Sequence, residues 1–301
     1  MKIATTIKGI QPFVDTPEQV ISAFSGTGFR YLDYDFGHVL HRENHWFMTD
    51  VWEREILKIK QTAEEAGIAF VQAHAPSCVL RGDGLEMGIL ATTRAIEACG
   101  ILGIRNMVIH SGFFKELKYP QDQEQYFQEN EPFFKALIPA MEKNQVHVLF
   151  ENTTFNHCVE GCYFPILARD LNAFVEFMNH PLFGAAWDVG HAHIDGIDHE
   201  KEILELGQNL KAIHVHDNQG FRDEHLIPFM GNVDFDSLMR GLTKSGYRGY
   251  FTLEVKRFFD YRSNAPDGPL KNIDLTLKKE TLSIMYSICR YILSAYGVYE
   301  E

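Results

Sequence analysis

The sequence predicts one α/β domain, a single (β/α)8 TIM barrel over residues 1–301. Segments typical of β-strands alternate with segments typical of helices along the whole chain, and strict alternation favours a parallel sheet. Eight such pairs are present, which is the number that closes a barrel. A doubly wound open sheet is the alternative, but the G-x-G-x-x-G turn expected after its first strand is absent.

The predicted strands are short runs rich in β-branched and aromatic residues. In chain order they cover residues 2–7, 31–36, 69–75, 106–110, 147–152, 184–189, 210–216 and 250–255. The predicted helices show the 3.6-residue periodicity and cover residues 17–25, 50–66, 85–99, 121–144, 171–178, 201–206, 235–243 and 275–296. Thr16 and Pro17 mark a helix start, and Gly67 and Gly100 mark helix ends. Prolines inside 121–144 predict a helix interrupted around Pro132 and Pro139.

Composition narrows the class of protein. The chain is 45% hydrophobic, which is ordinary for a globular domain. It holds 41 acidic and 28 basic residues and has a net charge of −13, so its surface repels phosphate backbones and argues against nucleic acid as a partner. No apolar run reaches the 18 residues that a membrane span needs, and we expect no membrane partner.

The start of the chain and its cysteines suggest the compartment. Residues 1–7 hold one lysine and too short an apolar run for a secretory signal. The five cysteines are an odd number and form no C-x-x-C pair. We therefore expect reduced thiols and a cytoplasmic protein.

Acidic and imidazole side chains recur where six successive predicted strands end. They are His74, His110, Glu151, Asp188, His214 (with His216 two residues on) and Glu254. Successive strand residues point to opposite faces, and Asp188 shares a face with the small Ala186, as Glu254 does with Thr252. Because the carboxyl ends of barrel strands form one mouth, we expect these side chains to converge there.

Such a convergence predicts a bound cation. Buried carboxylates cost several kcal/mol each unless they are paired or bind a metal. Oxygen ligands with one imidazole suit Mn²⁺, Mg²⁺, Co²⁺ or Zn²⁺. His191, three residues after Asp188, and the pair Asp223 and His225 are further candidate ligands, although Asp-x-His in a charged loop is also typical of a solvated turn.

Several short motifs, in this order, resemble the xylose isomerase-like TIM-barrel superfamily, which includes sugar isomerases and epimerases and the endonuclease IV nucleases of abasic DNA. The motifs are QAHAP (72–76), VIHSG (108–112), FEN (150–152), DVGH (188–191), HVHD (214–217), DEHLIP (223–228) and LEV (253–255). Each motif alone is weak, and their order and spacing carry the resemblance.

For the sugar-converting branch, the resemblance implies one divalent metal held by Glu151, Asp188, His214 and Glu254. It favours His214 over His216 because the family pattern is His-x-x-Asp, which leaves His216 beside a ligand or facing substrate. For the nuclease branch, it implies three zinc ions. Those positions map onto His74, His110, Glu151, Asp188, His191, His214, Asp223, His225 and Glu254, so more than one ion can be accommodated.

The expected function is that of an isomerase or epimerase of a sugar or sugar derivative in carbohydrate metabolism. By the resemblance, proton transfer next to a metal-bound carbonyl proceeds through an enediolate. Glu151 and Glu254 remove and return the proton, and His191 positions a substrate oxygen. His74 and His110 orient the sugar or hold another metal. Family epimerases often carry a further glutamate six residues after the first ligand, where this chain has His157.

The alternative is an endonuclease IV-like zinc phosphodiesterase acting on abasic DNA. The charge of −13 favours sugar chemistry, as do aromatic residues expected at the rim: Trp46, Phe47, Phe113, Phe114, Phe229, Phe258 and Phe259. Arg222, Lys256 and Arg257 lie on late loops, where barrels commonly bind phosphate. They either bind a phosphate group of the substrate or are ordinary solvated surface residues. A dehydratase, a sugar-binding barrel without turnover and a homo-oligomer also stay open.

Overall fold

Eight parallel strands surround a central axis in the computed structural model, which describes residues 1–11, 14, 16–41, 45–155, 162–256 and 274–301. The strands are β1 (Ile3–Thr6), β2 (Tyr31–Asp35), β3 (Ala69–His74), β4 (Asn106–Ile109), β6 (His147–Glu151), β8 (Phe183–Asp188), β9 (Leu210–His214) and β10 (Phe251–Leu253). Their order in the sheet is β10-β1-β2-β3-β4-β6-β8-β9.

The two end strands of this order meet just beyond β9. Val215 forms a parallel bridge with Leu253. The Val215 N–H donates to the Thr252 carbonyl at 2.8 Å, and the Glu254 N–H donates to the Val215 carbonyl at 2.9 Å. The predicted (β/α)8 barrel is therefore confirmed.

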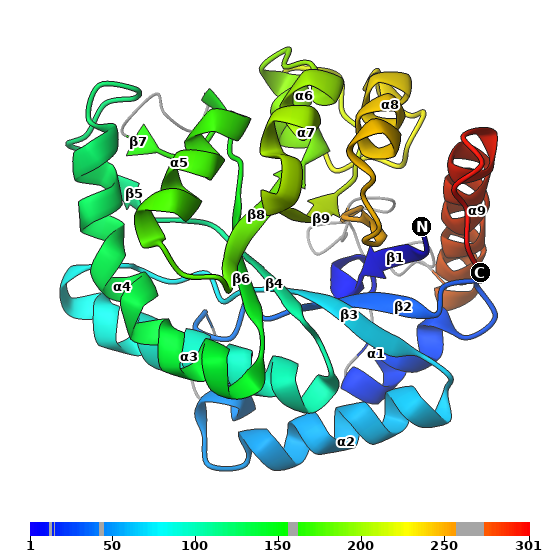
Figure 1. Cartoon of the computed structure of the whole chain (residues 1–301). Coiled ribbons are helices and arrows are strands. Elements are labelled where there is room, and N and C mark those ends of the chain that lie inside the picture. Colours follow the sequence, from blue (N-terminus) through cyan, green and yellow to red (C-terminus); the bar gives the residue numbers. More distant parts are fainter. Residues whose placement is uncertain (12–13, 15, 42–44, 156–161, 257–273) are drawn as a thin grey trace, which may run out of the picture.

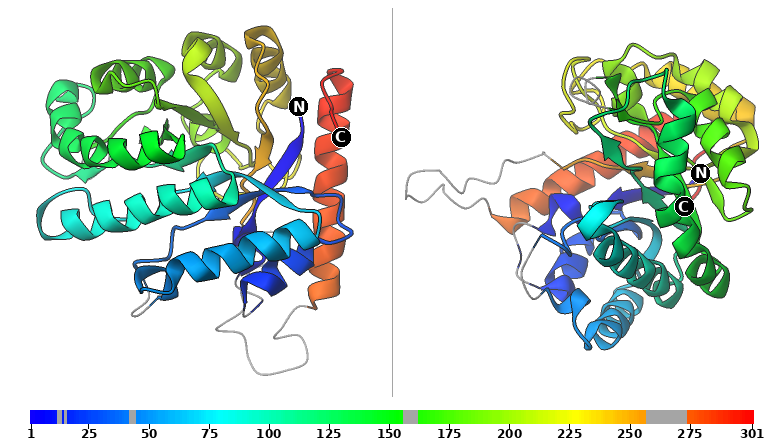
Figure 2. Two further views of the ribbon diagram at one scale, coloured as in Figure 1. Left: turned by 60° about the horizontal axis from the view of Figure 1, so that its bottom comes forward. Right: turned by 90° about the vertical axis from the view of Figure 1, so that its left-hand side faces the viewer.

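Helices lie outside the strands in all three ribbon views (Figures 1 and 2). They are α1 (Pro17–Phe24), α2 (Trp52–Glu65), α3 (Leu85–Leu102), α4 (Gln123–Asn144), α5 (Ala168–Met178), α6 (Val189–Ile194), α7 (His199–Leu206), α8 (Phe235–Ser245) and α9 (Leu275–Ala295). Short 3₁₀ helices occur at Ile7–Gly9, Trp46–Met48, Gly82–Gly84 and Gly207–Asn209. The predicted strands and helices end within three residues of the observed bounds.

The prediction of an interrupted helix around Pro132 and Pro139 was wrong. α4 runs without a break from Gln123 to Asn144. Both prolines lie seven residues apart on the exposed side of α4, where water can bind the carbonyls that they leave unpaired. The buried side of the same helix holds large aromatic residues such as Phe133 and Phe134.

A small antiparallel strand pair and a short helix were not predicted. β5 (Phe113–Phe114) pairs antiparallel with β7 (Cys162–Tyr163), which joins the segments that follow β4 and β6. α6 begins directly after β8 because the Asp188 carboxylate accepts the His191 N–H at 2.7 Å and caps the helix. α6 thereby fixes how the chain leaves the barrel at Asp188.

The hydrophobic core has two parts. The larger part lies between the strands and the helices and includes Trp187. The smaller part, inside the barrel, consists of Val108, Leu149, Ala186 and Ala212. Each of these four precedes a predicted site residue by two positions, so His110, Glu151, Asp188 and His214 stand one layer above them on the same face.

The described helices and cysteines can be compared with the sequence predictions. None of the described helices combines the length and the apolar character that crossing a bilayer demands. Cys78, Cys99 and Cys289 carry free thiols, whereas Cys158 and the side chain of Cys162 lie outside the description.

Candidate metal centre

Four residues expected to bind one cation come together at the carboxyl ends of the strands. Glu151 ends β6, Asp188 ends β8, His214 ends β9, and Glu254 directly follows β10. One potential ligand atom from each residue lies within 4.8 Å of those from the other three. All four side chains are buried, with at most 3% of the residue exposed. This spacing allows one small ion to contact all four.

The charges of these residues are strongly linked. Burial favours the neutral form of Glu151, but His214 holds the pKa of its carboxyl well below the usual value. Burial likewise opposes ionisation of Glu254, but Lys256, His214 and Lys8 hold the pKa of that carboxyl well below its usual value. Both glutamates are therefore carboxylates near neutral pH, the form that binds a cation.

Asn152 fixes the position of Asp188. The Asn152 side-chain amide donates to the Asp188 carbonyl at 2.9 Å, and its oxygen accepts the Asp188 N–H at 2.6 Å. One turn into α6, His191 Nδ1 lies 2.8 Å from the Asn152 carbonyl. Burial lowers the pKa of His191, but Asp188 and Asp223 outweigh it and raise that pKa to about 10.

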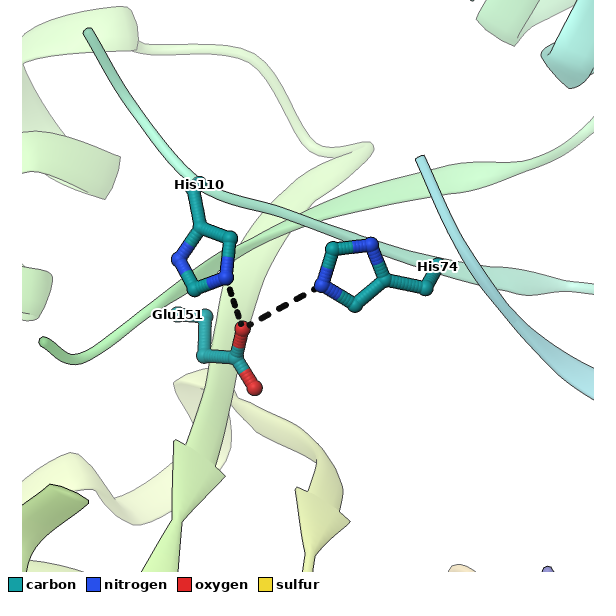
Figure 3. A group of neighbouring side chains, drawn as sticks. All are labelled: His74, His110 and Glu151. Carbon is teal, nitrogen blue, oxygen red and sulfur yellow. Dashed lines mark ion pairs between the residues drawn. The ribbon is translucent and has the colours of Figure 1, made fainter. Parts of the chain in front are cut away.

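Glu151 also belongs to a second cluster, with His74 and His110 (Figure 3). The second oxygen of Glu151, Oε2, lies 3.2 Å from His110 Nε2 and 3.7 Å from His74 Nε2. His74 Nδ1 donates to the Ala75 carbonyl at 3.0 Å, which turns Nε2 toward Glu151 as a potential cation ligand. Burial lowers the pKa of His110 to about 3, so its imidazole is neutral.

A third cluster consists of His216, Asp223 and His225. Asp223 Oδ2 lies 2.9 Å from His225 Nε2, and Asp223 Oδ1 lies 3.6 Å from His216 Nε2. His191 is next to this cluster, with its Nε2 3.7 Å from Asp223 Oδ2. His216 also contacts Asp188 at 3.2 Å and is fully buried, which places it between two clusters. All ten residues singled out in the sequence therefore lie at one mouth of the barrel.

The donor atoms fit divalent cations. Within the part of the chain that the structure describes, the buried atoms of these clusters that have no hydrogen-bond partner include Glu151 Oε2, Asp188 Oδ2, both ring nitrogens of His216 and Asp223 Oδ1. Unpartnered buried oxygen and nitrogen atoms are costly, and metal ligation satisfies them. Carboxylate oxygens mixed with imidazole nitrogens match Mn²⁺, Co²⁺ and Zn²⁺, and Mg²⁺ where oxygens dominate.

Residues at the first two strands also reach the clusters, although the sequence did not predict them. Lys8 Nζ lies 3.2 Å from Asp35 Oδ1 and 3.3 Å from Glu254 Oε1. Asp33 Oδ2 lies 3.0 Å from His214 Nε2. The available signal was the alternation in β2, where Asp33 and Asp35 interrupt a run of apolar residues at every second position.

Several rim residues differ from expectation. Lys256 is only partly exposed, and its Nζ lies 3.0 Å from Glu254 Oε1 and 2.9 Å from His225 Nε2. Phe47 and Phe114 are core residues with 1% exposure and do not line a mouth. Phe113 and Phe229 are exposed, and Trp46 is half-buried. Arg222 is exposed, while His157, Arg257, Phe258 and Phe259 lie outside the described residues.

Comparison with known proteins agrees with the barrel fold. The sequence profile of the family described as xylose isomerase-like TIM barrel matches residues 23–278. This chain belongs to that family. In the fold comparison, D-psicose 3-epimerase from Clostridium cellulolyticum H10, solved with D-tagatose, superposes with a TM-score of 0.73 at 15% identity over 97% of this chain and 99% of that one.

Curated relatives match shorter segments. An uncharacterized protein of Methanocaldococcus jannaschii is 27% identical over 168 residues, which is 55% of this chain and 56% of that protein. The match thus spans about half the length of that relative. Fructoselysine 3-epimerase of Escherichia coli O157:H7 is 40% identical over 50 residues, 17% of this chain and 18% of that enzyme.

Proposed function

We propose that the chain is a metal-dependent isomerase or epimerase of a sugar or sugar derivative. The observation that carries the proposal is the convergence of Glu151, Asp188, His214 and Glu254 within 4.8 Å at the mouth of the barrel. Family membership supports it, and so do the similar proteins that bear the names D-psicose 3-epimerase and fructoselysine 3-epimerase. Whether the reaction is an isomerisation or an epimerisation stays open.

The proposed chemistry is proton transfer at the carbon next to a carbonyl. A divalent cation held by the four residues would polarise that carbonyl and stabilise the negative charge that develops on its oxygen. Glu151 ends β6 and Glu254 directly follows β10, so the two lie on different sides of the cluster. One carboxylate takes the proton from carbon and the other returns it, while His191 holds a substrate oxygen.

We assign the cofactor as Mn²⁺, Mg²⁺, Co²⁺ or Zn²⁺, with room for more than one ion. Charge supports this assignment. The mouth gathers the carboxylates of Asp33, Asp35, Glu151, Asp188, Asp223 and Glu254 against the ammonium groups of Lys8 and Lys256. A single divalent ion leaves an excess of negative formal charge there even with His191 protonated, and such an excess disfavours phosphorylated substrates.

Deuterium uptake tests this proposal. The protein, loaded in turn with each of the four metals, is incubated in D₂O with a panel of free ketoses and aldoses, and NMR follows exchange of the carbon-bound hydrogens. We expect metal-dependent exchange and product formation with at least one sugar. Glu151→Gln should abolish both, and Glu142→Gln, at an exposed position, should leave both unchanged. Undiminished exchange in Glu151→Gln would refute the mechanism.

A second candidate is a zinc phosphodiesterase of the endonuclease IV type acting on abasic DNA. The observation that favours it is the grouping of eight of the nine positions of the nuclease pattern in three adjoining clusters, with the ninth, His191, next to Asp223. The net charge of −13 opposes it, because DNA binding needs basic residues along the phosphate backbone. Elemental analysis together with assays on abasic DNA separates the two, since three zinc ions per chain with strand cleavage would favour the nuclease.

The proposed partner is therefore a small-molecule sugar. A cytoplasmic setting and assembly into a homo-oligomer remain predictions from the sequence.

A further inference from the structure

The layer of the barrel directly beneath the candidate metal centre is half apolar and half polar. Val108, Leu149, Ala186 and Ala212 form the apolar half, on β4, β6, β8 and β9. Asp33, Gln72 and Thr252 lie on β2, β3 and β10, and hydrogen bonds join them to each other. Asp33 is 1% exposed, and full burial is unusual for a carboxylate unless it is paired.

Asp33 reaches across the barrel to His214. Its Oδ2 lies 3.0 Å from His214 Nε2, and two strands, β10 and β1, separate β9 from β2 in the sheet. The other ring nitrogen, Nδ1, contacts Glu151 Oε1 and lies 3.8 Å from Glu254 Oε2. His214 thus turns Nδ1 toward the four-residue cluster and Nε2 toward Asp33.

The hydrogen-bond directions around Asp33 are fixed by its neighbours. The Thr252 hydroxyl donates to Gln72 Oε1 at 3.3 Å, which orients the Gln72 amide so that its Nε2 donates to Asp33 Oδ2 at 3.5 Å. Asp33 therefore serves as an acceptor for Gln72. The same oxygen is positioned to accept a hydrogen bond from His214 Nε2–H.

An imidazole that binds a cation through one nitrogen carries its proton on the other. In a fully buried ring such as His214, that N–H needs an acceptor, because an unsatisfied buried donor costs about 1–3 kcal/mol. Asp33 is that acceptor in the present geometry. A carboxylate in this role also fixes the ring orientation and makes the opposite nitrogen a better ligand.

We propose that Asp33 is a positioning residue, which orients His214 so that Nδ1 faces the cation and Nε2–H is held by the carboxylate. This inference rests on the proposed function, because it assumes that the four-residue cluster binds a metal. It assigns to β2 a part in the centre that the strand-end pattern of the sequence does not reveal. Asp33 itself is not a ligand, since the imidazole ring of His214 lies between it and the cluster.

Zinc affinity tests the inference. Zn²⁺ dissociation constants are measured by competition with a chromogenic chelator for the full chain and for Asp33→Asn. We expect Asp33→Asn to weaken binding about 10- to 100-fold. The matched control is Asp170→Asn, which alters another buried carboxylate whose hydrogen bonds go to Tyr119 and to the backbone of Ile166 and Leu167. That control should bind Zn²⁺ within about twofold of the unaltered chain.

A second measurement needs no altered carboxylate. Long-range ¹H–¹⁵N NMR spectra of the zinc-loaded chain report which nitrogen of each histidine bears the proton, and His214→Gln assigns the signals. We expect the proton of His214 on Nε2. A proton on Nδ1, or unchanged zinc affinity in a folded Asp33→Asn, would overturn the inference while leaving the proposed function intact. Failure of the unaltered chain to bind any of the four metals would overturn both.

Discussion

The ammonium group of Lys8 lies 3.3 Å from one carboxylate oxygen of Glu254 and 3.2 Å from a carboxylate oxygen of Asp35. These three residues come from the ends of β1, β10 and β2, which are neighbours in the sheet. Burial lowers the pKa of Lys8, but Glu254 and Asp35 outweigh it and raise that pKa above the ordinary value. Lys8 therefore carries a positive charge throughout the accessible pH range and partly neutralises the acidic mouth.

Replacing this lysine should destabilise the metal-free chain. In Lys8→Met two buried carboxylates lose a cationic partner, and breaking a buried ion pair costs about 3–5 kcal/mol. We expect urea unfolding in EDTA to show a loss near the lower end of that range, because the Lys8 side chain is 15% exposed. Saturating Zn²⁺ should reduce the loss, since the metal supplies positive charge to Glu254.

The control for this variant is Lys58→Met. Lys58 is exposed and pairs with Glu55 on the surface of α2. Solvent screens such pairs, so we expect a much smaller change. Equal losses in the two variants would contradict the role assigned to Lys8.

Gly190 provides a test of packing at the centre. A Cβ at this position of α6 would overlap the imidazole ring of His216. Gly190→Ala should therefore lower the free energy of unfolding by about 1–3 kcal/mol in EDTA. The added methyl group would collide with the His216 ring. The double variant Gly190→Ala/His216→Ala should therefore lose less free energy of unfolding than the sum of the losses in the two single variants. Additive losses would show that the contact does not limit the packing.

His199 should make stability depend on pH. Its side chain is buried behind the metal centre, and Trp187 Nε1 donates to its Nδ1 at 3.3 Å. Burial lowers its pKa from 6.5 to about 4, with His193 acting in the same direction and Asp234, Asp198 and Asp188 opposing it. The unfolded chain thus binds a proton at a pH where the folded chain does not, and stability falls as the pH drops from about 6.5 to about 4.

This contribution amounts to about 3 kcal/mol over the full interval. Urea unfolding in EDTA at pH 7 and pH 4.5 should therefore show a smaller pH effect in His199→Gln than in the unaltered chain. His180→Gln, at the partly exposed partner of Glu142, serves as the control and should keep the full pH effect. An unchanged pH effect in His199→Gln would contradict the assignment.

Binding of the metal should itself stabilise the fold. A ligand present at 100 times its dissociation constant adds about 2.7 kcal/mol to the free energy of unfolding. We expect the thermal midpoint to rise when Zn²⁺ replaces EDTA. Glu151→Gln should show a smaller rise because Glu151 belongs to two of the three clusters, whereas Glu142→Gln should show the full rise. Equal rises in both variants would argue that zinc binds elsewhere.

Much of the fold follows from local sequence patterns. Strand–helix alternation gives the barrel, because each strand such as β8 must be buried on both faces and each helix on one. The helix was wrongly predicted to be interrupted at Pro132 and Pro139, because periodicity alone does not show which side of a helix faces water. That information depends on the packing of α4 against the barrel.

The site was predictable where a charged residue ends a strand, as at Glu151 and Asp188. It was not predictable where a contact joins distant parts of the chain. Asp33 and His214 are 181 residues apart, and Lys8 and Glu254 are 246 apart, so only closure of the barrel brings them together. Lys256 was misjudged for a related reason, because its neighbour His225 approaches it through a loop from another strand.

Anomalous diffraction from crystals grown with Zn²⁺ or Mn²⁺ tests the central claim most directly. The account predicts an anomalous peak bonded to one atom each of Glu151, Asp188, His214 and Glu254, at about 2.0–2.2 Å for Zn²⁺. Occupied metal positions elsewhere with no peak among these four residues, at metal concentrations that saturate the protein, would contradict it.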